Sequence, residues 1–236
     1  MNESLRPSGW RGLKQTILAP TALASAIRAG LGWAVPALVI SLTVITLDVV
    51  ALPLFLRSLP QMAPQGLSPE MMAGFERTSR IMRPIQILMS PIGLIIRWAI
   101  IAFLLYLISV LIDRKTSFRD LFVLVVYAGL IPLLEVIAKN IVLWLRYAFT
   151  GTIVIDHPLG LDAVFQPKGA ALSTLLQHAN VFELWFLGAL IIGIHVLCRC
   201  SKRWAAAIVL PVWGIWLAGH IAYAMGREVL IKQLGA

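Results

Sequence analysis

Charged residues and cysteines are scarce in this chain. Only 13% of its 236 residues are charged and two are cysteines, whereas 59% are hydrophobic and the mean hydropathy is +0.87. Soluble domains are roughly 45–50% apolar, so the apolar surplus exceeds what the core of a water-soluble protein takes up. A lipid bilayer can absorb it, and the composition therefore predicts an integral membrane protein.

Motifs that mark common enzymes and metal sites are also missing. The chain has no G-x-S-x-G, no phosphate-binding loop and no Gly-rich dinucleotide fingerprint, which leaves hydrolase and nucleotide-binding functions without support. Its four histidines lack a ligand spacing such as H-E-x-x-H, and Cys198 and Cys200 form one isolated C-x-C, a poor metal motif. We therefore predict no catalytic residue, no cofactor and no metal, and expect a protein that is not an enzyme.

Acidic residues are few, and the formal net charge is +9. In a soluble protein this charge would suggest a nucleic-acid partner, but no nucleic-acid motif accompanies it. The basic residues stand mostly in short segments beside apolar runs, where they contact lipid headgroups and set the topology. Membrane lipids are therefore expected partners, and nucleic acid is not.

Five apolar segments have lengths suited to crossing a bilayer as α-helices, for which about 17–25 residues are needed. The sequence predicts an all-α integral membrane protein, with a tail at 1–30 and a five-span domain at 31–236. The first run begins at Leu31 and is too long for the apolar region of a cleavable signal peptide. The predicted spans are 31–56, 92–112, 121–145, 181–197 and 205–223.

Amphipathic helices are expected beside the spans. The segment 20–30 begins with proline and ends with glycine, as a short interfacial helix does. Within 69–83, large apolar residues recur at near-helical spacing behind an N-cap serine, which predicts a surface helix. Pro84 and Pro91 are expected to mark the return to the membrane. For the connection 146–180, the sequence predicts only a partly helical segment on the outer side.

The distribution of basic residues sets the expected orientation. The tail and the two tight turns carry ten Lys and Arg residues, and the two long connections and the C-terminal tail carry eight. The totals are close, but the tight turns are much denser in positive charge, and dense basic loops stay in the cytoplasm. We expect a prokaryotic cytoplasmic (inner) membrane protein, with its N-terminus in the cytoplasm and its C-terminus outside.

The third predicted span carries an acid and a base four residues apart. Glu135 precedes Lys139, so both heads lie on one helix face in the order that favours an ion pair. A lipid-facing pair would be costly. The face that carries Glu135 and Lys139 is therefore expected to look inward, toward other spans or a water-filled cavity.

With this orientation, the ionisable residues of the spans fall in the outer half of the bilayer. The expected polar cluster consists of Asp48, Arg97, Glu135, Lys139 and Glu183. In one interpretation these residues are structural and hold the spans together. In the other they bind a solute, an ion or a lipid headgroup, with Glu135 and Lys139 as binding residues and Asp48 as their partner from the first span.

Several segments together resemble the Ypt-interacting-protein (Yip) family of five-span membrane proteins, in its short prokaryotic form. One of them is TSFRDLFVLVVYAGLIPLL, with Tyr127 and Pro132, and Asn180 replaces an Asp that such members often carry. The resemblance implies a helical bundle with a cytoplasmic N-terminus. The resembling segments are 17–33, 68–93, 116–134, 172–196 and 203–217.

What the resemblance implies about function is limited. Eukaryotic relatives look like trafficking factors that bind Rab-type GTPases through longer N-terminal regions, so GTPase binding is not transferred to this short tail. We expect a non-enzymatic membrane scaffold or membrane-organising protein that contacts other membrane proteins or further copies of itself. The alternative is a small transporter, channel or lipid-handling protein that uses the polar cluster.

Overall fold

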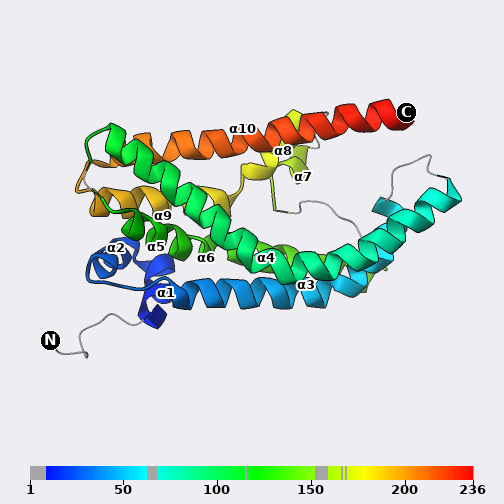
Figure 1. Cartoon of the computed structure of the whole chain (residues 1–236), viewed down its shortest axis with the longest axis horizontal. Helices are drawn as coiled ribbons and strands as arrows, with labels where there is room; N and C mark the ends of the chain where they lie inside the picture. Colours follow the sequence, from blue (N-terminus) through cyan, green and yellow to red (C-terminus); the bar gives the residue numbers. More distant parts are fainter. Residues whose placement is uncertain are drawn as a thin grey trace. The chain divides into compact units, whose positions relative to one another are not determined.

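The computed structural model describes residues 9–62, 68–114, 116–151, 159–165, 167 and 169–235, and every regular element in this part of the chain is an α-helix. Figure 1 shows the helices along the chain. Their bounds are α1 Gly9–Leu18, α2 Pro20–Arg28, α3 Ala34–Met62, α4 Pro69–Leu111, α5 Phe118–Ala128, α6 Leu130–Thr150, α7 Asp162–Phe165, α8 Ala170–His178, α9 Val181–Leu197 and α10 Lys202–Gly235.

Among the described residues, the helices provide four membrane crossings, or five if one bent pair of helices forms a single crossing. Four stretches are long and apolar enough by themselves: Ala34–Leu59, Pro69–Leu111, Phe118–Thr150 and Lys202–Val229. The fifth candidate is the pair α8 and α9, whose axes differ by 59° across a short break, as in a broken span or a re-entrant loop. The chain is therefore an all-α membrane protein, as expected, and the count of five crossings stays a prediction.

By their internal contacts the residues group into two compact units, each described by itself below. Unit 1 contains 1–42, 92–135 and 181–216, and unit 2 contains 43–91, 136–180 and 217–236. The boundaries pass through α3, α4, α6 and α10. The division into a tail at 1–30 and a membrane domain at 31–236 stays a prediction.

Helix α5 forms the core of unit 1. Seven of its eleven residues are buried, because α5 packs against α1, α2 and α9 (Figure 1). Gly193 of α9 makes the close approach possible, since a Cβ there would lie 2.4 Å from Leu124 of α5. At Pro132 the backbone lacks the N–H that would bond to the carbonyl of Ala128. The expected single helix of the third span is accordingly divided at Gly129 into α5 and α6.

The N-terminal segment is folded onto unit 1. In α2, Leu23, Ala24 and Ile27 are buried, and the helix packs against both α5 and α9. Arg28 then donates from Nη2 to the carbonyls of Val196 and Leu197 at 2.5 and 2.6 Å, so its cation satisfies the C-terminal end of α9. The expected interfacial helix thus exists, but its apolar face contacts protein.

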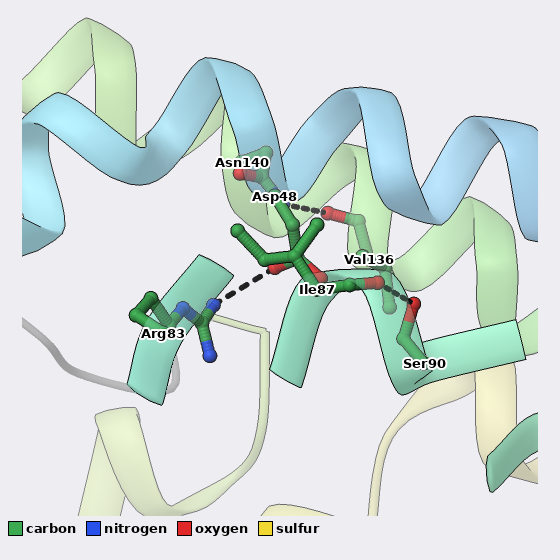
Figure 2. A network of polar contacts seen from close by, with 6 residues as sticks. All are labelled: Asp48, Arg83, Ile87, Ser90, Val136 and Asn140. Atoms are coloured by element: carbon green, nitrogen blue, oxygen red, sulfur yellow. Dashed lines mark hydrogen bonds and ion pairs between the residues drawn. The ribbon is translucent and has the colours of Figure 1, made fainter. Parts of the chain in front are cut away.

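Helix α4 is continuous through Pro84 and Pro91. The prediction of a separate surface helix that ends near Arg83 is therefore wrong. A proline inside a helix leaves the carbonyl four residues earlier without its backbone donor. For Pro91 that carbonyl belongs to Ile87, and Ser90 Oγ donates to it at 2.9 Å (Figure 2). The serine side chain replaces the lost bond, as it can in membrane helices.

Candidate functional site

Arg97 of α4 is the central charge of unit 1. The residue is exposed, and its guanidinium carbon lies 4.5 Å from the ring centroid of Trp216 on α10. A cation held over an indole face is attracted by the negative potential of the ring, and the attraction increases when water is excluded. Trp216 therefore gives Arg97 a defined position between α4 and α10.

Glu183, at the start of α9, is held by a second indole of α10. Trp213 donates from Nε1 to Glu183 Oε1 at 2.8 Å. Trp213 and Trp216 are three residues apart, so they lie next to each other on one face of the helix. One face of α10 thus binds an acid from α9 and a base from α4.

Glu135 is the second acid of this group. It is only 8% exposed, which agrees with the prediction that its helix face points inward. Glu183 and Glu135 both act electrostatically on Arg97. With all three groups ionised, Arg97, Glu135 and Glu183 carry a net charge of −1.

A partly open cavity of about 30 Å³ lies beside Arg97 and Glu183. A single water needs roughly 10–15 Å³ of such volume, so the cavity has room for two or three. Each of α4, α9 and α10 lines it with a row of residues at helical spacing. The rows are Arg97, Ile101 and Leu105; Glu183, Phe186, Leu187 and Leu190; and Val209, Val212, Trp213 and Trp216.

The polar residues of the cavity lie at the same distance along their helices, measured from neighbouring helix ends. Arg97 and Glu183 each precede the end of their helix by fourteen residues, and Trp216 follows the start of α10 by the same number. These helix ends are neighbours, because Arg114 after α4 lies 5.7 Å from the ring centroid of Trp204 on α10. At 1.5 Å per residue the level is about 21 Å from these ends, or two-thirds of the way through a hydrocarbon layer of roughly 30 Å.

A second polar group lies in unit 2, around Asp48 of α3. Arg83 of α4 donates from Nη2 to Asp48 Oδ1 at 2.9 Å, as Figure 2 shows, and both side chains are about 30% exposed. The Arg83 guanidinium also lies 4.9 Å from the ring centroid of Phe55. In the same unit Arg57 donates to the hydroxyl of Tyr147. Basic residues therefore join the helices of unit 2 as well.

The predicted cluster is thus distributed over both units. Unit 1 brings Arg97, Glu135 and Glu183 together, whereas Asp48 and the half-buried Lys139 belong to unit 2. Asp48 was expected beside Glu135 and Lys139, and within unit 2 it forms an ion pair with Arg83. That the five residues form one binding cluster stays a prediction.

A family model for the Yip1 domain matches residues 14–223 of the chain. The chain belongs to this family. The match confirms the resemblance seen in the sequence, and both polar groups lie within it. No curated protein and no solved structure matches the chain.

Sequence reasoning missed several residues of this Yip1-domain protein's polar groups. Trp213 and Trp216 carry a signal in their spacing of three, which places both indoles on one helix face. Arg83 was assigned to a surface helix. Asp48 lies fourteen residues before the end of α3, and Arg83 lies fourteen residues after the start of α4. If the two helices form a hairpin, these equal distances predict that Asp48 and Arg83 meet.

The C-x-C of the Yip1-domain chain lies in the turn between α9 and α10. Cys198 and Cys200 are buried, at 7% and 5% exposure, and His195 Nδ1 bonds to the carbonyl of Cys200. Burial raises the pKa of both thiols. Among the residues that the structure describes, no three His, Cys, Asp or Glu side chains gather as metal ligands do. His157 lies outside the described residues.

Proposed function

We propose that this Yip1-family membrane protein is a non-enzymatic scaffold, which organises other membrane proteins or further copies of the chain through helix contacts. One observation carries the proposal: the charges of unit 1 are engaged between helices. Glu183 bonds to Trp213, and Arg97 lies on Trp216. Polar contacts inside lipid bind spans together, so this group holds α4, α9 and α10 as a firm platform.

The exposed face of α4 in unit 1 is the candidate contact surface of the platform. It presents a row of large apolar side chains spaced three or four residues apart, each between 43% and 75% exposed. A row of this kind packs along another helix, and we propose that its occupant is an apolar transmembrane helix. The row consists of Ile92, Ile96, Ile100, Phe103, Leu107 and Leu111.

Photo-crosslinking in the native membrane tests this function. A photoreactive amino acid at Ile96, Ile100 or Phe103 is expected to yield discrete protein adducts, whose masses distinguish a second copy from another protein. Ile215 of α10 is 61% exposed and serves as the matched position on another helix. Adducts with lipid alone at the three α4 positions would refute the scaffold function.

The proposal includes location and orientation. We infer that the protein lies in a prokaryotic cytoplasmic membrane with its N-terminus inside and its C-terminus outside. Support comes from the dense positive charge of the turns after α4 and after α9. GTPase binding is not proposed for this chain.

A small transporter, channel or lipid-handling protein is the second candidate. The cavity beside Arg97 and Glu183 favours this candidate, because it combines charged groups with apolar walls. Glu135→Gln and Lys139→Met test the use of the wider predicted cluster. Loss of a growth or transport phenotype with unchanged thermal stability would support the second candidate. No change in either refutes it, and loss of stability alone supports the scaffold.

A further inference from the structure

Another cavity of unit 1 lies where α4 ends and α5 begins. Its volume is about 480 Å³, and it is open to the surroundings. Ligand pockets have volumes of roughly 300–1,000 Å³, so this cavity has room for a phosphate group and the glycerol attached to it. The described residues that line it are Tyr106, Val110, Asp113, Arg114, Thr116 and Ser117.

The turn after α4 places Arg114 at this cavity. Asp113 has a left-handed backbone, with φ of 55°. The N–H of Asp113 donates to the carbonyl of Val110 at 3.0 Å, and the N–H of Arg114 donates to that of Ser109 at 2.8 Å. These two bonds form the Schellman motif that ends many helices. The motif fixes the backbone of Arg114 beside the last turn of α4.

Arg114 has a defined position but no acidic partner. Its guanidinium carbon lies 5.7 Å from the ring centroid of Trp204, and no carboxylate in the described part of the chain forms an ion pair with it. Arg114 also acts electrostatically on the thiols of Cys198 and Cys200. Burial raises the pKa of both thiols, so they are neutral near pH 7 and leave the cation to an anion from outside the chain.

The start of α5 adds donors to the same cavity. Ser117 Oγ accepts from the N–H of Asp120 at 3.1 Å, as an N-cap does, so its own O–H remains to donate. The first N–H groups of α5 have no partner within the helix, and the positive end of the helix dipole favours an anion. Arg114 and the start of α5 together therefore suit a phosphate.

The inner wall of the cavity belongs to the membrane crossing of α4. Tyr106 lies five residues before the end of α4, which is about 7.5 Å along the helix. Its ring packs edge-on against Phe118 of α5, with the centroids 6.5 Å apart, so the side chain is held beside the start of α5. The cavity thus joins a basic turn, where headgroups gather, to the apolar edge of the bilayer.

We infer that this cavity binds the phosphodiester of a membrane phospholipid. Arg114 and the O–H of Ser117 donate to the phosphate oxygens, and the glycerol lies against Tyr106 and Val110. Asp113, the acid among the described lining residues, accepts from the donors of the headgroup. A hydroxyl and an ammonium can both donate to a carboxylate, so the site selects the phosphate and not the rest of the headgroup.

Native mass spectrometry of the full chain in detergent tests this inference. Three lipids with identical acyl chains are added at equal concentration: a phospholipid with a glycerol headgroup, one with an ethanolamine headgroup, and a neutral lipid with a sugar headgroup. Both phospholipids are expected to be retained about tenfold more than the neutral lipid, because only they offer a charged acceptor to Arg114. Equal retention of all three lipids would overturn the inference.

Two variants of neighbouring arginines locate the site. Arg114→Gln is expected to lower the retention of both phospholipids to that of the neutral lipid. Arg119→Gln is the matched control, because Arg119 is an exposed base of the same connection that does not line the cavity, and it should retain the preference. Equal losses in the two variants would show a general effect of positive charge and overturn the site.

A third variant and a soluble competitor complete the design. Tyr106→Phe keeps the ring against Phe118 but removes a hydroxyl donor at the glycerol, so phospholipid retention should fall by about threefold. If Arg114→Gln does not fold, this variant decides, and unchanged retention overturns the site. Soluble glycerophosphoethanolamine, which has the headgroup without acyl chains, is expected not to displace the phospholipid. Displacement would show a site for free phosphodiesters and overturn the lipid as ligand.

Discussion

Asp48 and Arg83 form an ion pair across unit 2, with Nη2 and Oδ1 2.9 Å apart, although 35 residues separate them in the chain. Each lies fourteen residues from the end of its helix that faces the connection between α3 and α4. Phe55 covers the guanidinium, so the pair is partly shielded. The contact holds the two helices in one register.

The energetic contribution of this pair can be measured with a double-mutant cycle of Asp48→Asn and Arg83→Gln. Because both side chains are only about 30% exposed, we expect a coupling of about 1 kcal/mol. The measurement is the free energy of unfolding in detergent. The pair Glu76 and Arg80, at 3.9 Å on the surface of α4, is the matched control, with an expected coupling of about 0.3–0.5 kcal/mol. Equal couplings would show that the register does not depend on Asp48.

Removing the indole donor to Glu183 should destabilise unit 1. Trp213→Phe keeps an aromatic ring but loses the Nε1–H that bonds to the carboxylate at 2.8 Å. A hydrogen bond to a charged group contributes about 1.5–3 kcal/mol, so the melting temperature should fall. Trp185→Phe, on α9, is the control and should shift it far less. If Trp213→Phe melts like the unaltered chain, Glu183 has another sufficient donor.

Tyr127 anchors the N-terminal segment to the core of unit 1. The side chain is fully buried, and its hydroxyl lies 3.3 Å from the carbonyl of Gly9 and 3.2 Å from that of Gly32. Tyr127→Phe should cost about 1 kcal/mol and increase hydrogen exchange in α1 more than in α9. Tyr223→Phe, at a residue that is 74% exposed, is the control. Uniform exchange along the chain would contradict the anchoring role.

The packing of α1 on Tyr127 gives a steric prediction. A Cβ at Gly12 would lie 2.6 Å from a ring carbon of Tyr127, well inside van der Waals contact. Gly12→Ala should therefore displace α1 and expose it to proteolysis, whereas Gly32→Ala, where nothing lies within 4 Å, should not. Protection of α1 in both variants would show that the helix shifts without detaching.

The two cysteines should react slowly with alkylating reagents near neutral pH. The thiolate is the reactive form, and burial raises the pKa of both Cys198 and Cys200 above the usual value of about 8.5. The thiolate fraction at pH 8 is therefore smaller than in a free thiol. The alkylation rate of the folded chain should still rise with pH at values where the alkylation rate of the unfolded chain has already reached its maximum. Coincident profiles of the folded and unfolded chain would contradict this prediction.

The proposed orientation is tested by a reporter fused after Ala236. A reporter that works only outside the cytoplasm should be active, and one that works only in the cytoplasm should be silent. The opposite pattern would reverse the orientation and with it the assignment of the polar level to the outer half of the bilayer.

The sequence by itself determined the apolar helices that can cross a membrane, the Yip family and the inward face of Glu135. These follow from local quantities, since helix length, apolar content and the spacing of Glu135 and Lys139 depend on residues close together in the chain. The tertiary structure alone decided the partners of Asp48 and Glu183, because these meet residues 35 and 30 positions away. It also decided that α4 continues past Pro91, since the carbonyl freed by the proline is satisfied by the hydroxyl of Ser90.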